Sequence, residues 1–251
     1  MKGSKERKSI TTVKNIKRLS QWYTSFSVDA MYFHMALENV EQAKGAKVGV
    51  DSMNKQITKL EKKEKEIIKR YNGDEFTAYS ELEPIAIAIV DNLHPRLEEA
   101  YKPYLEALSL IYLLGVASLE AHINIRAENT LTGIHLEHFD KLSLEGKWLF
   151  YPKITGKSGF DPGREPFQSF SKIVKNRNKL VHYKNRQELW QSGKVPQFVD
   201  ALGLNLKAVQ HAVAVVKQMM LAIAKQFKEN APDWLKNKPI SYFTFFTNFT
   251  K

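Results

Sequence analysis

The chain has 251 residues, of which 43% are hydrophobic, so it is long enough to form one substantial core. Its 38 lysines and arginines exceed its 27 aspartates and glutamates, and the formal net charge of +11 favours a polyanionic partner, although a solvated basic surface would explain the same excess. Because the chain contains no cysteine, disulfides, thiolate zinc sites and cysteine nucleophiles are excluded.

Neither a leader nor a membrane anchor is predicted from the hydropathy pattern. The first twenty residues are basic and no apolar run follows them, which is unlike a signal peptide. The longest apolar stretches, such as the one that begins at Leu108, are too short or too interrupted to span a bilayer. We therefore expect a cytoplasmic protein that has no membrane partner.

Helical periodicity dominates the first third of the chain. Residues 13–43 have apolar side chains, including Tyr23 and Phe26, at spacings near three and four, which predicts one or two amphipathic helices. Residues 51–71 have a narrow apolar side and dense mixed charge elsewhere, as expected of an exposed helix. Asn72 and the glycine after it are expected to end that helix.

Two further signals precede the middle of the chain. Ser80 and Glu83 have the spacing of a capping box, which predicts that a helix begins there. The His94 and Pro95 step is expected to break the chain, because the residue before a proline disfavours the helical conformation. A long helix is then predicted over residues 103–129.

The second half of the chain is also mostly helical. A short helical turn is predicted over residues 142–150, and a glycine-rich loop separates it from a helix over residues 166–184. Asn205 is expected to cap a last long helix that ends at Phe227. The tail after Ile240 alternates weakly between apolar and polar residues and is compatible with a docked strand.

An arginine falls within the apolar side of the helix predicted over residues 166–184. Projection at about 100° per residue places Arg177 at the centre of that side, where an unpaired guanidinium would cost several kcal/mol. Asn178 and His182 lie together at one edge of it, four residues apart. The apolar side consists of Phe167, Phe170, Ile173, Val174, Leu180 and Val181.

A partner for Arg177 is predicted in the preceding long helix. Glu120 lies within the apolar side of that helix, about 40° from Val116 in the same projection. We expect a buried ion pair between Glu120 and Arg177 that leaves some guanidinium donors for a ligand; a pair that only fixes the register of two helices is the alternative. His122 projects to another face and is expected to be a polar surface group.

The segment FQSFSKIVKNRNKLVHYK resembles the signature helix of the HEPN superfamily, whose motif is an arginine, four to six residues and a histidine. Arg177, the polar Asn178 and His182 match this motif, and HEPN domains also have an acidic residue in the helix that packs on it, as Glu120 would be. The resemblance extends over residues 95–229. It implies an all-α, HEPN-type four- or five-helix bundle over residues 95–251, with residues 1–94 as an N-terminal helical extension.

The resemblance also implies a function. Many HEPN domains are metal-independent endoribonucleases of toxin–antitoxin and phage-defence systems, and they commonly dimerise so that two motifs form one cleft. The expected catalytic residues are Arg177, His182, Asn178 and Glu120, without a metal or cofactor. Histidine, whose usual pKa is near 6.5, can act as acid or base at neutral pH, and the arginine can stabilise the charge of the phosphorane. Asn178 and Glu120 would orient the other two residues.

The residues around the motif are candidates for binding the substrate. Lys175, Lys179 and Lys184 are expected to contact phosphates, although a solvated basic face is an equal alternative. Tyr183 is a candidate for stacking on a base, with packing at the helix end as its alternative. The expected partners are RNA, a second copy of the chain with a composite active site, and a cognate antitoxin or regulatory protein.

Two rival interpretations remain open. One is a non-catalytic HEPN module that binds RNA or a protein partner. The other is a purely structural helical protein, in which Arg177→Ala would unfold the chain and His182→Ala would change nothing. A metal site is not predicted, because His135 and His138 do not have the spacing of a zinc protease motif.

Overall fold

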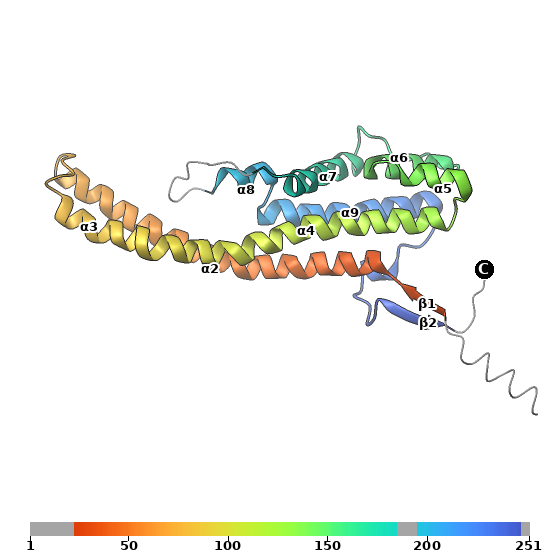
Figure 1. Cartoon of the computed structure of the whole chain (residues 1–251), viewed down its shortest axis with the longest axis horizontal. Helices are drawn as coiled ribbons and strands as arrows, with labels where there is room; N and C mark the ends of the chain where they lie inside the picture. The colour runs from red at the N-terminus through yellow and green to blue at the C-terminus, as the bar shows by residue number, and fades with distance from the viewer. Residues whose placement is uncertain (1–22, 185–194, 247–251) are drawn as a thin grey trace, which may run out of the picture.

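The computed structural model describes residues 23–184 and 195–246, with side chains described for residues 25–184 and 195–243, and almost all of this part is helical (Figure 1). The prediction of an all-α fold is confirmed. The helices are α2 (Val28–Arg70), α3 (Tyr79–Ile87), α4 (His94–Glu128), α5 (Gly133–Asp140), α6 (Leu144–Ile154), α7 (Phe167–Val181), α8 (Gln197–Leu202) and α9 (Leu206–Phe227). A π-helical turn, η1 (Ala88–Leu93), joins α3 to α4, and a 3-10 turn, η2 (Asp233–Leu235), follows α9.

Helix α4 lies at the centre of the bundle. It packs against α2 on one side and against α9 and α7 on the other, while α5 and α6 cover its C-terminal end (Figure 1). A hairpin extends away from the bundle, and it consists of the C-terminal half of α2 together with the whole of α3. This arrangement places α7, which contains the predicted motif, on the outer surface of the α4 and α9 pair.

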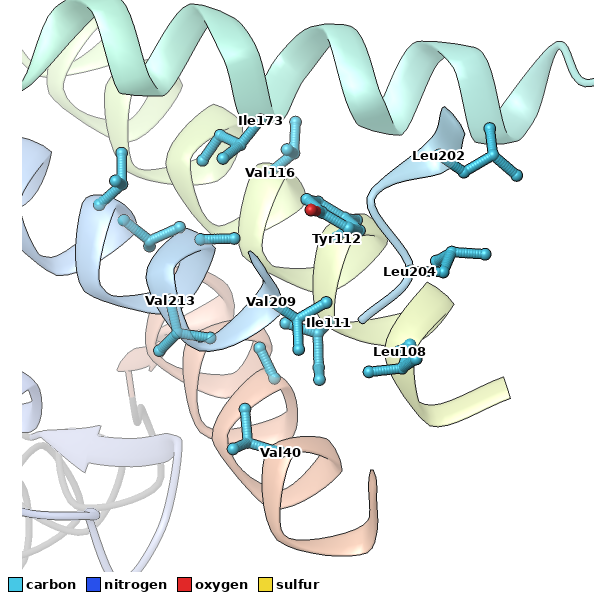
Figure 2. Packing of buried hydrophobic residues seen from close by; sticks show 14 of the residues in the cluster. Val40, Leu108, Ile111, Tyr112, Val116, Ile173, Leu202, Leu204, Val209 and Val213 are labelled. Atoms are coloured by element: carbon cyan, nitrogen blue, oxygen red, sulfur yellow. The ribbon is translucent and has the colours of Figure 1, made fainter. Parts of the chain in front are cut away.

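One hydrophobic cluster holds these helices together. Figure 2 shows Tyr112 and Val116 of α4 near Ile173 of α7, while Val40 of α2 lies on the other side of the same cluster, beyond Val209 of α9. The cluster therefore continues across the predicted division between residues 94 and 95, and the first part of α2 belongs to the same core as α4 and α9.

The first described element differs from the prediction. Strand β1 (Tyr23–Phe26) lies within the segment that was expected to be helical, and it pairs antiparallel with β2 (Phe243–Phe246). The partner strand comes from the other end of the chain, so the local helical periodicity of residues 13–43 could not reveal it. The predicted strand in the tail is confirmed by β2, whereas residues 13–22 lie outside the described part of the chain.

The predicted break before α4 is also wrong. Helix α4 begins at His94, nine residues before the predicted start, and it continues directly from the π-helical turn η1. Pro95 is in the first turn of α4, directly after the wider turn of η1. Ser80 is likewise not a cap, because α3 begins at Tyr79 without a side-chain capping bond.

The C-terminal helix follows the sequence closely. Asn205 is the N-cap of α9, its Oδ1 accepts a hydrogen bond from the N–H of Ala208 at 2.9 Å, and the helix ends at Phe227 as predicted. The short helices α5 and α8 were not predicted. The predicted turn over residues 142–150 corresponds to α6.

Among the described residues, two helical stretches are long and apolar enough to cross a membrane by length and composition alone. They lie in Tyr79–Glu128 and Gln197–Phe227, and 50% and 44% of their most apolar windows are buried inside the protein. Core helices of soluble proteins meet the same criterion, so this is weak evidence for a membrane span.

Replacement of Gly203 by alanine is expected to lower the free energy of unfolding by about 1–3 kcal/mol. Gly203 follows α8 with a φ of +68°, and a Cβ there would lie 2.9 Å from both the Asn176 Nδ2 and Tyr112 Oη atoms. Urea unfolding measures the loss. Gly45→Ala in α2 is the matched control, because in the described part of the chain no atom outside the adjacent backbone of α2 lies within 4 Å of its Cβ position, and alanine should stabilise that helix by up to about 1 kcal/mol. A Gly203→Ala protein as stable as wild type would contradict the clash.

Candidate functional site

Arg177 and Glu120 form the predicted ion pair between α7 and α4. The Arg177 Nη2 and Glu120 Oε2 atoms are 3.7 Å apart, a distance that is longer than a hydrogen bond. The prediction that both groups are buried is wrong, since the arginine side chain is 28% exposed and the glutamate side chain 45%. The guanidinium is therefore positioned next to a carboxylate while part of it remains accessible to solvent.

The accessibility of Arg177 follows from where α7 leaves the core. Phe167, Phe170, Ile173 and Val174, in its first two turns, are buried. Val181, in the last turn, is 53% exposed although the projection places it on the same apolar side. The C-terminal end of α7 thus presents an exposed surface, and Arg177 lies at the start of it.

His182 is the C-cap of α7 and not an internal helical residue, because the helix ends at Val181, three residues before the predicted end. Its backbone N–H donates to the carbonyl oxygen of Asn178 at 3.0 Å. The side chains of His182 and Asn178 are exposed. Within the described residues neither side chain makes a hydrogen bond, so the imidazole and the amide are both accessible to a substrate.

The four predicted substrate-binding residues surround this exposed end. Lys175, Lys179, Tyr183 and Lys184 all have exposed side chains. In the part of the chain that the structure describes, none of the three lysines lies within 4.0 Å of a carboxylate. The end of α7 is therefore a positively charged surface with an aromatic ring at its edge.

A second polar cluster, which the sequence did not predict, lies inside the protein. His122 of α4 is 6% exposed, so the prediction that it is a surface group is wrong. Its Nδ1 lies 2.9 Å from the Asp29 Oδ2 atom, and the Ser118 hydroxyl donates to the Asp29 carbonyl oxygen at 2.7 Å. The His122 ring also stacks on Trp148 of α6, with centroids 6.3 Å apart.

This cluster has a structural role. Asp29 lies in the first turn of α2, so its contacts join the start of that helix to α4. The Trp234 ring, after α9, forms a T-shaped pair with His122, with centroids 6.3 Å apart, and the Trp234 carbonyl oxygen accepts a hydrogen bond from His34 Nε2 at 2.8 Å. Because the imidazole is enclosed by two tryptophan rings, we assign no substrate to it.

Among the residues that the structure describes, no group of three or more histidine, aspartate or glutamate side chains is placed to hold a metal ion. His135 and His138 are exposed on the short helix α5.

Arg177→Ala is expected to lower the free energy of unfolding by less than about 1 kcal/mol, as measured by urea unfolding. The reason is that its ion pair with Glu120 is long and half exposed, and exposed pairs contribute little to stability. Glu120→Gln, which removes the charge and keeps the size of the side chain, should have an equally small effect. A loss of about 3–5 kcal/mol in Arg177→Ala would instead identify the pair as a device that fixes helix register.

Comparison with protein-family models, with curated proteins and with solved structures found no match. The assignment of a function to this chain therefore depends on the residues at the end of α7 and on their surroundings.

Proposed function

We propose that the chain is a HEPN-type, metal-independent endoribonuclease that acts on RNA as a homodimer. The observation that supports this proposal most strongly is that Arg177 and His182 lie at one solvent-accessible end of α7, with Arg177 next to Glu120. A structural ion pair alone needs neither an exposed histidine nor an accessible guanidinium. In metal-independent RNA cleavage, an accessible histidine can serve as acid or base and an accessible guanidinium can bind the reacting phosphate.

Arg177 has the role of binding and stabilising the reacting phosphate. A guanidinium has five N–H donors, and within the described residues none of those of Arg177 is used in a hydrogen bond. Glu120 restricts its position from a distance of 3.7 Å. Charge-assisted hydrogen bonds to the non-bridging phosphate oxygens would strengthen as negative charge develops on them in the transition state.

His182 supplies the acid and the base. One His182 imidazole removes the proton from the ribose 2′-hydroxyl as that oxygen bonds to phosphorus. His182 of the partner subunit protonates the 5′-oxygen as its bond to phosphorus breaks. One imidazole gains a proton and the other loses one, and the products have a 2′,3′-cyclic phosphate and a 5′-hydroxyl. Asn178, on the same helical face, orients the imidazole or a phosphate oxygen.

The exposed lysines and the net charge of +11 support RNA as the substrate, because contacts with phosphates dominate the affinity for nucleic acids. We further propose that the protein acts in the cytoplasm as a toxin or antiviral effector. An endoribonuclease without restraint would also cut the RNA of its own cell, so a cognate antitoxin or regulatory protein is part of the proposal.

The proposal is tested by incubating the purified full chain with RNA in EDTA and identifying the ends of the products. We expect cleavage that EDTA does not inhibit and that leaves 2′,3′-cyclic phosphate ends. RNA that remains intact across pH and salt conditions would contradict the proposal, and cleavage that requires added metal would contradict the mechanism.

A test in cells addresses the proposed toxicity. Induced expression of the wild-type chain is expected to slow the growth of the host, and induced expression of the His182→Ala chain to the same level is not. Equal inhibition by both proteins would contradict a toxic effect that depends on catalysis.

A further inference from the structure

A second site candidate lies on another face of α7. A pocket of about 330 Å³ opens between α7 and α9, at the lower end of the range of about 300–1,000 Å³ that is usual for small-molecule sites. Ser169, Lys172 and Asn176 of α7 line it, opposite Lys207 and His211 of α9. Asn176 and Arg177 are neighbours in the helix and project about 100° apart, so the pocket is on a different side of α7 from the motif.

The floor of the pocket has a fixed geometry. Tyr112 is 2% exposed, its hydroxyl donates to the Gly203 carbonyl oxygen at 3.1 Å, and it accepts from Asn176 Nδ2 at 3.3 Å. Burial raises the pKa of the Tyr112 phenol above its ordinary value. Figure 2 shows Tyr112 between α7 and the turn that precedes α9. The amide of Asn176 is thereby held in one orientation at the base of the pocket.

The walls of the pocket have an excess of positive charge. Lys172 of α7 and Lys207 of α9 both line the pocket, and neither is within 4.0 Å of a carboxylate in the described part of the chain. His211 Nε2 is 3.4 Å from the Ser169 hydroxyl oxygen, and that hydroxyl donates to Glu165 Oε1 at 2.8 Å. Glu165 is the carboxylate in this network, and Ser169 lies between it and the histidine.

We propose that this pocket binds the phosphate group of a small phosphomonoester. A monoester has a charge of about −1.5 to −2 at pH 7, which matches two lysines that have no carboxylate partner. The diester linkages of RNA have a single charge each. The amide oxygen of Asn176, which its contact with Tyr112 does not use, can accept a hydrogen bond from a hydroxyl group of the organic part. The proposal does not depend on ribonuclease activity, because it concerns a different face of α7 and predicts binding only.

The test is isothermal titration calorimetry of the full chain with glycerol 3-phosphate, with inorganic phosphate, and with glycerol as the neutral control. We expect saturable binding of the two phosphates and none of glycerol. Lys172→Gln and Lys207→Gln should each weaken the binding of glycerol 3-phosphate about tenfold, the loss of one charge-assisted hydrogen bond. Lys217→Gln is the matched control, since this exposed lysine is also in α9 but does not line the pocket.

Three outcomes would overturn the proposal. The first is the absence of saturable binding of either phosphate. The second is an equal loss of affinity in Lys207→Gln and Lys217→Gln, which would mean that only the general charge of the surface matters. The third is binding of a short RNA without a terminal phosphate that depends on Lys207, with no binding of glycerol 3-phosphate. Thermal melts of each variant verify that the lysine substitutions leave the fold intact.

Discussion

Replacement of His182 by alanine is expected to slow RNA cleavage by about 10²–10⁴-fold and to leave the free energy of unfolding within about 0.5 kcal/mol of wild type. The side chain is exposed beyond the last turn of α7, so its removal leaves neither a cavity nor a buried polar group without a partner. In the proposed dimer the substitution removes both the acid and the base. Initial rates on a labelled RNA oligonucleotide and urea unfolding of the same preparation measure the two effects.

His135→Ala is the matched control for this experiment, because His135 is also exposed but lies on α5, away from the motif. It should cut RNA at the wild-type rate. Since all variants are purified in the same way, a His182→Ala protein that cuts as fast as wild type would show that His182 has no part in the reaction, or that the activity comes from a contaminating nuclease.

Substitution of Arg177 provides a second, independent test of the proposed active site. Arg177→Ala should lower the cleavage rate by about 10²–10³-fold, the usual cost of removing one donor that stabilises a transition state. Arg177→Lys keeps the charge but loses the planar array of donors, so an intermediate rate is expected. If the cleavage rate of Arg177→Ala falls only as far as the loss of folded protein explains, Arg177 has a structural role and no catalytic one.

Much of the fold could be predicted because its signals are local. Asn205 caps α9 by a contact with a residue three positions away, and the apolar positions of α9 repeat along 22 residues. The partner of Arg177 was also predictable, since a charge on the apolar side of each of two long helices implies that the charges meet. These inferences need only the geometry of a single helix and the cost of an unpaired charge.

The errors have a common physical origin. A helical projection gives the angle of a side chain around the axis, but it does not show how far the neighbouring helices extend along that axis. Arg177 and Val181 were therefore expected to be buried, whereas the Arg177 side chain is 28% exposed and Val181 is 53% exposed. Similarly, β1 pairs with a strand from the other end of the chain, and that pairing outweighs the helical periodicity of its residues.

The contact between Asp29 and His122 shows most clearly that local sequence patterns do not reveal contacts between distant segments. The two residues are 93 positions apart, and neither has a local pattern that indicates its partner. Asp29 alone is consistent with a favourable acidic residue in the first turn of a helix. Only the packing of α2 against α4 brings the carboxylate and the imidazole together.

Asp29→Ala is expected to lower the free energy of unfolding, as measured by urea unfolding, by about 3 kcal/mol. The substitution leaves the buried His122 Nδ1–H without an acceptor and opens a small cavity at the start of α2. A carboxylate can only accept, so the imidazole donates from Nδ1 in the native pair. Asp29→Asn keeps an acceptor for this N–H, and it should therefore recover at least half of the stability that Asp29→Ala loses. Asp51→Ala removes an exposed carboxylate 2.5 Å from Lys47 in the same helix and should cost less than about 1 kcal/mol. Equal effects of Asp29→Ala and Asp51→Ala would mean that the buried pair does not join α2 to α4, and the stability of the bundle would then have to come from its apolar contacts alone.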